Sequence, residues 1–106
     1  MPAPLVVTIP HRLGRDQARR RVDRGLDHVR ARIASFVSGL EYEWSDYRLD
    51  WSLRAIGQRI TGRTIVEDEQ VLIEIDLPLL LRMLSGPIID AVRKEGVSLL
   101  AKPPGA

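Results

Sequence analysis

The chain has 106 residues, of which 44% are hydrophobic and 28% are charged, so it has material for one core and is too apolar to be intrinsically disordered. Cysteine is absent, which excludes disulfide scaffolds, thiolate zinc sites and cysteine nucleophiles, and fits a reducing compartment. The net charge is +2, but residues 1–38 contain eight Arg and three Asp, while the remainder contains eight basic and eleven acidic side chains. This asymmetry raises the question of an anion-binding surface.

The sequence carries no targeting or membrane-spanning segment that we can identify. Residues 1–10 lack a basic start followed by a long apolar run, and charges interrupt every later apolar stretch before it could span a bilayer. We therefore expect a cytoplasmic protein. We also expect a single α+β domain over residues 1–106, with a short flexible tail at about residues 102–106.

The N-terminal part predicts a strand followed by a long helix. Residues 5–9 form a β-branched run between two prolines, which is typical of a strand near a sheet edge. Apolar residues then recur at steps of three and four and predict a helix from about Arg15 to Val37 that stops at Gly39. The residues of this stripe are Ala18, Val22, Leu26, Val29, Ile33 and Phe36.

After the helix the apolar period changes to two, which predicts an antiparallel meander of about four strands. Aromatic and leucine residues alternate with polar ones over residues 42–53 and predict two strands. A third strand is expected at 59–66, where Gly62 indicates a bulge or the close approach of another backbone. Residues 67–69, Glu-Asp-Glu, predict a turn into a last strand at 71–75.

The C-terminal segment predicts a helix that is kinked or split. Pro78 ends the last strand and can begin this helix. Gly86-Pro87 should kink or divide the helix, because proline has no backbone N–H to donate and its ring clashes with the preceding turn. The predicted buried arc consists of Leu80, Leu81, Leu84, Ile88, Ala91 and Val92. The element order predicts an α+β fold in which the helices pack on one face of the sheet.

Three short motifs occur in a fixed order along the chain: Ile-Pro-His-Arg-Leu-Gly at 9–14, Gly-Arg-Thr-Ile-Val-Glu-Asp at 62–68, and Leu-Ser-Gly-Pro-Ile at 84–88. Together with the Ala/Arg-rich helix, this order resembles the polyhydroxyalkanoic acid system proteins, a family found with genes for polyhydroxyalkanoate granules. The resemblance covers roughly residues 6 to 95, and segment 53–56 departs from it by being more apolar.

The family is defined by the genes near which its members are found and not by a biochemical activity. The resemblance therefore implies a role in polyester storage but identifies no catalytic residues. The motif residues also have a structural interpretation. Pro10, His11 and Gly14 predict a connection from strand to helix, and Gly86 and Pro87 predict a helix kink.

The ionisable residues form no catalytic or metal-binding constellation, so we predict a protein that is not an enzyme and has no cofactor. The histidines are His11 and His28, and His28 lies on the helix flank without metal-ligand neighbours at the required spacing. No serine has the flanking glycines of a nucleophile elbow, and no phosphate-cradling glycine loop precedes a helix. Residues 67–69 lack the spaced ligands of a calcium loop and predict a solvated turn.

The arginines of the long helix are one candidate binding surface. Clustered guanidinium groups such as Arg20, Arg21 and Arg24 bind phosphates well, so the alternative function is a basic-helix adaptor for nucleic acid or an acidic protein. The competing interpretation is a solvated face with internal ion pairs, namely Asp16 with Arg20, Arg19 with Asp23 and Asp27 with Arg30. Nucleic acid is disfavoured because the aromatic residues Tyr42, Trp44, Tyr47 and Trp51 lie in the predicted strands.

Apolar residues outside the predicted arc are the second candidate surface: Leu79, Met83, Ile89 and Val97. Such patches are usually covered by another subunit, a ligand or a hydrophobic surface, although these residues could instead pack against the meander. The leading hypothesis is a non-enzymatic, phasin-like accessory protein that binds the polyhydroxyalkanoate granule surface or a granule-associated protein, with homo-oligomerisation left open. A third hypothesis is a small-molecule carrier with a cavity near Trp44 or Trp51.

Overall fold

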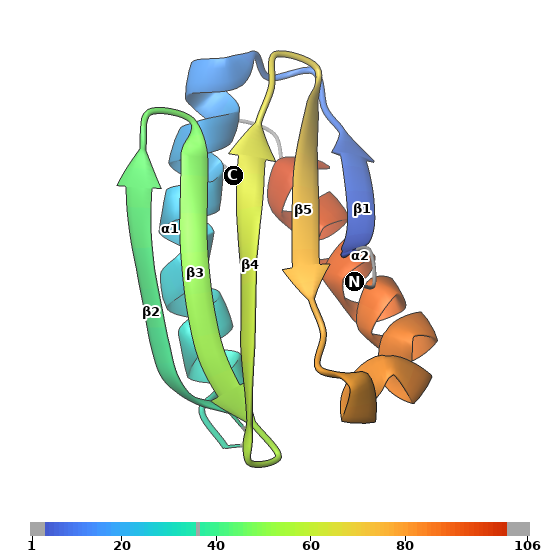
Figure 1. The fold of residues 1–106 in the computed structure, drawn as a ribbon. Coiled ribbons are helices and arrows are strands. Elements are labelled where there is room, and N and C mark those ends of the chain that lie inside the picture. The colour runs from blue at the N-terminus through green and yellow to red at the C-terminus, as the bar shows by residue number, and fades with distance from the viewer. Residues whose placement is uncertain (1–3, 36, 102–106) are drawn as a thin grey trace.

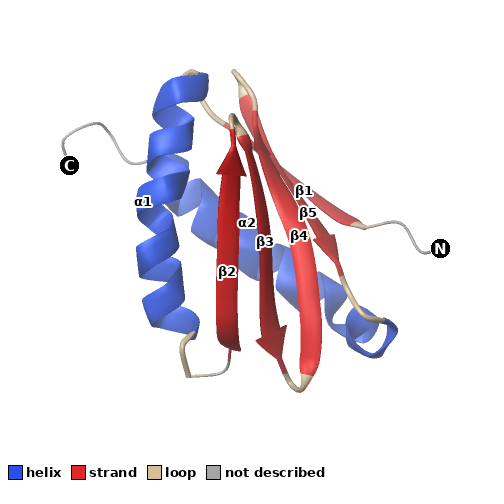
Figure 2. Cartoon of the chain, turned by 60° about the vertical axis from the view of Figure 1, so that its left-hand side comes forward, coloured by secondary structure: helices blue, strands red, loops and turns tan. Residues whose placement is uncertain are grey.

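The computed structural model describes residues 4–35 and 37–101 and shows one antiparallel sheet with both long helices on the same face (Figures 1 and 2). The elements in chain order are β1 (Leu5–Pro10), α1 (Arg15–Ile33), β2 (Val37–Ser45), β3 (Arg48–Ala55), β4 (Gln58–Val66), β5 (Gln70–Asp76), the 3₁₀ helix η1 (Leu79–Leu84) and α2 (Ser85–Ala101). The predicted α+β fold is confirmed. The predicted tail at 102–106 lies outside the described residues.

The sheet has the strand order β1-β5-β4-β3-β2. The four strands β2 to β5 form the predicted meander, and β1 adds a fifth strand by pairing antiparallel with β5, from Leu5 opposite Ile75 to Pro10 opposite Gln70. β1 is therefore an edge strand, as the prolines at its ends predicted. Proline is tolerated there because an edge strand has one side on which no donor is needed.

Helix α1 ends earlier than the sequence predicts. The expected helix runs to Val37 and stops at Gly39, but α1 ends at Ile33 and Val37 already pairs with Ala55 of β3. Strand pairing with a distant segment has overridden the local helical period. Gly39 does adopt a left-handed φ of 63°, but it does so where the register of β2 shifts between Ser38 and Glu41, so it serves a β-bulge and not a helix end. Phe36, the last residue of the predicted stripe, lies outside the described residues.

The C-terminal helix is split, but the break does not lie at Gly86-Pro87. The chain forms 3₁₀ turns up to Leu84 and α2 begins at Ser85, so Pro87 sits in the first turn of α2, where its missing N–H has no helical partner to lose. The predicted buried arc is correspondingly wrong in part: Leu80, Leu84 and Ala91 are exposed. Leu81 is buried, and Ile88 and Val92 are half-buried.

The core lies between the sheet and the helices in two adjoining clusters. The larger cluster joins strands β1, β3, β4 and β5 to both α-helices. Its buried residues are Val7, Ile9, Ala18, Val22, Leu49, Val66, Val71 and Leu100. The smaller cluster lies under the end of β5 and contains Ile60, Ile75, Leu77 and Leu81. Trp51 is half-buried and packs against both clusters. Leu81 is thus the residue by which η1 is fixed to the sheet.

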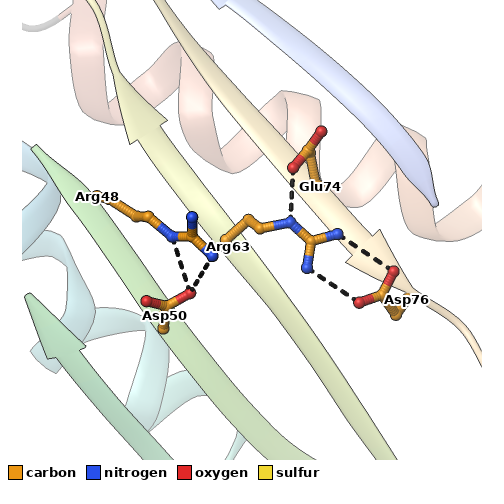
Figure 3. Close-up of polar contacts among 5 residues, drawn as sticks. All are labelled: Arg48, Asp50, Arg63, Glu74 and Asp76. Atoms are coloured by element: carbon orange, nitrogen blue, oxygen red, sulfur yellow. Dashed lines mark hydrogen bonds and ion pairs between the residues drawn. The ribbon is translucent and has the colours of Figure 1, made fainter. Parts of the chain in front are cut away.

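The opposite face of the sheet is open and charged (Figure 3). Arg63 in the middle of β4 donates from Nε to Glu74 at 2.6 Å and from its two terminal nitrogens to the Asp76 carboxylate at 3.1 and 3.3 Å. The hydrogen bonds to Asp76 and Glu74 raise the pKa of Arg63, so its charge is fixed. Arg48 forms a simpler pair with Asp50 on β3. This face is solvated, as is common for antiparallel sheets.

Candidate functional site: an exposed apolar 3₁₀ helix

Among the described residues, the largest group of highly exposed apolar side chains lies on η1. Leu79, Leu80 and Met83 have exposed fractions of 81%, 72% and 86%, and Leu84 is also exposed. These four residues surround Leu81, which is buried among Ile60, Ile75 and Leu77. We refer to Leu79, Leu80, Met83 and Leu84 as the η1 patch. The patch is therefore held by a buried anchor while its own side chains face solvent.

The local backbone explains why these side chains stay outside. Pro78 precedes η1, and its carbonyl accepts the first hydrogen bond, from the Leu81 N–H at 2.9 Å. A 3₁₀ helix has three residues per turn, so residues at steps of three share a face and those between them point elsewhere. With Leu81 directed into the core, Leu79, Leu80 and Met83 lie off the buried face. Leu84, three residues after Leu81, lies on the same face as Leu81 and is the least exposed member of the patch, at 37%. The Ser85 hydroxyl donates to the Arg82 carbonyl at 2.5 Å where η1 ends.

The predicted apolar surface is only partly brought together. Leu79 and Met83 lie in the η1 patch, and Leu80 and Leu84 join them although the sequence analysis placed both in the core. Val97 is exposed but lies on α2, twelve residues beyond the start of that helix, which corresponds to about 18 Å along its axis. Ile89 is half-buried and packs against the larger core cluster, so it is not part of an exposed surface.

The first two family-like motifs meet at one end of the sheet. The buried His11 accepts the Leu13 N–H at Nδ1, 3.2 Å away, and its Nε2 lies 2.9 Å from the Glu67 carbonyl oxygen. The His11 N–H donates to the Glu69 carbonyl at 2.9 Å. Asp68 Oδ1 accepts the Arg15 N–H at 3.2 Å and so satisfies a donor at the start of α1. This arrangement fits the structural interpretation of Pro10, His11 and Gly14.

Arginines of α1 are stacked on aromatic residues of β2 and of the β2–β3 turn, where Tyr47 lies although a strand was predicted for it. The guanidinium carbon lies 4.7 Å from the ring centre for Arg15 over Tyr47, 4.3 Å for Arg19 over Trp44 and 5.5 Å for Arg30 over Tyr42. Cation–π contacts of this kind contribute about 0.5–1 kcal/mol each at exposed sites. These arginines therefore hold α1 against the β2 edge of the sheet.

The predicted ion pairs within α1 are wrong: none of the three is among the ion pairs within 4.0 Å that join described residues. Two of the carboxylates instead accept from aromatic donors, one in the β2–β3 turn and one on β2. Asp16 accepts the Tyr47 hydroxyl at 2.5 Å, and Asp23 accepts the Trp44 indole N–H at 2.9 Å. A cross-element hydrogen bond has replaced the local pair for Asp16 and for Asp23. In the third pair, Arg30 stacks on Tyr42.

The three arginines predicted to bind polyanions differ in their surroundings. Arg21 is half-buried and donates to the Leu99 carbonyl at 3.4 Å, which joins α1 to α2. Arg20 is exposed and donates to Gln17 at 3.3 Å, and Arg24 is exposed. The three do not form one equally accessible cluster. His28 is exposed on the same helix.

A surface depression of about 600 Å³ is open to solvent at the start of α1, where it is lined by residues that include Arg15, Arg20, Tyr47 and Asp68. It does not lie at Trp44 or Trp51, where a carrier cavity was expected. Within the described ranges, no three His, Asp or Glu side chains are gathered so that they could hold a metal ion. No described helix combines the length and apolarity needed to cross a membrane.

Comparison with known proteins identifies the family. Residues 5–100 match the family model described as "Putative polyhydroxyalkanoic acid system protein". No match was found among curated proteins or among solved structures. The match includes every described strand and η1, and it extends to Leu100 in the last turn of α2. The chain therefore belongs to the polyhydroxyalkanoic acid system protein family.

Proposed function

We propose that this protein is a non-enzymatic, cytoplasmic accessory protein of the polyhydroxyalkanoate system that binds the polyester granule surface through the η1 patch. The observation that carries the proposal is the high exposure of Leu79, Leu80 and Met83 on one short helix, where Leu80 and Met83, three residues apart, share a face. Contiguous apolar surface of this kind marks contacts with another hydrophobic surface. The family supplies the context in which an apolar polyester is that surface.

The energy available from the patch is of the right order for adsorption. Full burial of a Leu or Met side chain contributes about 1.5–3 kcal/mol, so three such side chains offer about 5–9 kcal/mol. Part of this offsets the loss of translational and rotational freedom on binding. Little of the adsorbed protein should be released when salt is added, because the contact is not between charges.

A binding role without catalysis is further supported by how the histidines are used. Both ring nitrogens of His11 are engaged by the Glu67 carbonyl and the Leu13 N–H, so neither is available to a substrate. His28 is exposed on α1 and does not line the surface depression at the start of that helix. We assign neither histidine a catalytic role.

The test is co-sedimentation of the purified protein with polyhydroxyalkanoate granules at low and high salt. We expect salt-resistant binding by the wild-type chain and loss of binding by the double variant Leu79→Glu, Met83→Glu. The matched control is Ala91→Glu, Val97→Glu, which adds the same charge at two exposed positions on α2 and should bind normally. Circular dichroism must show that both variants are folded.

Unaltered binding of the folded η1 variant would remove the patch from the proposed function. A nucleic-acid pull-down serves as the parallel measurement for the alternative function, a basic-helix adaptor. Salt-sensitive capture of nucleic acid without granule binding would favour that alternative. It has less structural support, because Arg15, Arg19 and Arg30 are stacked on sheet aromatics.

A further inference from the structure

In the turn between β3 and β4, a β-branched residue has a backbone conformation that disfavours such side chains. Ile56 and Gly57 have φ values of 54° and 69° and form a two-residue connection between Ala55 and Gln58, which pair with each other. Two left-handed residues in such a hairpin favour Asn-Gly, and a β-branched residue in this conformation is an outlier. Ile56 is also 74% exposed, so no packing offsets its strain.

A second unfavourable feature lies beside this turn. Arg54 and Arg59 are directly opposite each other on β3 and β4, and both are exposed. Like charges in a directly opposed pair destabilise a sheet. Among the described residues, no ion pair within 4.0 Å includes either of these arginines. The tip of the hairpin thus combines an exposed apolar residue with two adjacent positive charges.

The hairpin tip lies at the same end of the sheet as the η1 patch. β3 ends and β4 begins where the antiparallel β5 ends and leads into η1, as Figures 1 and 2 both show. The two features are also joined inside the molecule, because Ile60 of β4 and Leu81 of η1 belong to the same core cluster. A surface that meets this end of the molecule can therefore contact both.

We propose that the β3–β4 hairpin tip is a second attachment site, which inserts Ile56 into the apolar layer of an anionic lipid surface while Arg54 and Arg59 bind the lipid phosphates. This inference rests on the proposed function in taking the η1 end of the sheet as the binding face, but the surface bound by the hairpin tip is an anionic lipid layer and not the polyester itself, so salt-sensitive binding is expected for the lipid alone. The charge of the tip favours a negatively charged lipid layer over a neutral apolar surface. The exposure of Ile56 and the repulsion between Arg54 and Arg59 are unfavourable in the free protein, and an anionic lipid layer would bury the first and neutralise the second.

The experiment is flotation of the full chain with vesicles of phosphatidylglycerol and phosphatidylcholine, compared with vesicles of phosphatidylcholine alone. We expect binding to the anionic vesicles that weakens with salt. Ile56→Asn should reduce partitioning about tenfold, the equivalent of losing partial burial of one Ile side chain. The same variant should raise Tm by about 4 °C or more, because Asn-Gly suits the turn. Simultaneous stabilisation and loss of binding would not follow from misfolding.

The charge contribution is tested with Arg54→Gln, Arg59→Gln. Each arginine near an anionic surface contributes about fivefold to partitioning, so this variant should lose more than tenfold and most of its preference for anionic vesicles. The matched control Arg12→Gln, Arg93→Gln removes two exposed arginines, one between β1 and α1 and one on α2, and should partition as the wild-type chain does.

Three outcomes would overturn the inference. One is equal binding of Ile56→Asn and the wild-type chain to anionic vesicles, a second is equal binding of the wild-type chain to both kinds of vesicle, and a third is that the tip variants alter only self-association in sedimentation velocity. Failure here is separable from failure of the proposed function. If granule binding depends on Leu79 and Met83 but vesicle binding ignores Ile56, the η1 proposal stands and the hairpin inference fails.

Discussion

The Nε2 atom of His11 lies 2.9 Å from the carbonyl oxygen of Glu67, 56 residues later in the chain. Because Nδ1 of the same ring accepts the Leu13 N–H, the ring proton belongs on Nε2, which donates to Glu67. One neutral imidazole therefore joins the start of α1 to the turn between β4 and β5. The first two sequence motifs are explained by this single connection.

Replacement of His11 by Ala should destabilise the protein by about 1–3 kcal/mol, because a backbone donor and a backbone acceptor lose their partner in a buried setting. Urea denaturation measures the change in the free energy of unfolding. The control is Arg12→Ala, an exposed neighbour whose loss should change stability by less than about 0.5 kcal/mol. If the His11 variant is as stable as this control, the connection contributes nothing.

Gly62 on β4 marks a close approach, as its position in a strand predicted. A methyl group added there would collide with the backbone oxygen of Glu74 and the ring of Trp51. We expect Gly62→Ala to cost about 1–3 kcal/mol by overpacking, measured as a fall in the midpoint of thermal unfolding. Gly86→Ala is the control, because the added methyl group meets no atom beyond its chain neighbours and its own helix backbone, so its cost is limited to the local contact with the Pro87 ring. A Gly62 variant of unchanged stability would contradict the packing account.

The sequence predicted elements wherever local pattern and tertiary structure agree. The stripe that includes Ala18 and Val22 identified α1 because one face of a surface helix must meet the core. The end of α1 was misplaced because Val37 fits both a helical stripe and a strand, and only its pairing with Ala55 decides between them. No local pattern contains that pairing.

The candidate site was predicted only in part for a related reason. Leu79 and Met83 were identified as leftover apolar residues, but Leu80 and Leu84 were assigned to the core on the assumption of a 3.6-residue period. A three-residue period counted from Leu81 places Leu80 and Met83 off its face, and the preceding Pro78 is a signal that could have suggested it. The same period leaves Leu84 on the face of Leu81, and its 37% exposure is not explained by the helix type. The hairpin tip was missed because the strain at Ile56 depends on its φ value, which sequence composition does not reveal.

Arg63 and Arg48 provide a matched pair on the open face of the sheet. Arg63 makes hydrogen bonds to two carboxylates and its side chain is 24% exposed, whereas Arg48 pairs with Asp50 alone and is 54% exposed. Lysine keeps the charge but cannot form the two-pronged contact with Asp76. We expect Arg63→Lys to lower the free energy of unfolding by about 1 kcal/mol and Arg48→Lys by less than about 0.5 kcal/mol. Equal effects in chemical denaturation would argue against a special contribution of Arg63.

The phenol of Tyr47 should titrate above its ordinary value. Its hydrogen bond to the Asp16 carboxylate, followed by burial and the negative charge of Asp16, raises the pKa of Tyr47 above 10.0. Asp16→Asn should bring the pKa of Tyr47 down towards 10.0. A neutral amide does not repel the phenolate, and it accepts a weaker hydrogen bond from the phenol than a carboxylate does. The chain has two tyrosines, so ultraviolet titration in a Tyr42→Phe background isolates Tyr47.

The same shift determines how stability depends on pH. Below pH 10.0 the folded and unfolded states both keep the phenol proton, and the hydrogen bond contributes fully. As the pH rises above 10.0 the unfolded state loses its proton first, so this contribution declines and is gone once the pH passes the folded pKa. Tyr47→Phe should remove that part of the alkaline loss of stability. If urea denaturation across this pH range gives the same slope for the wild-type and Tyr47→Phe chains, the Asp16 hydrogen bond does not control the titration of Tyr47.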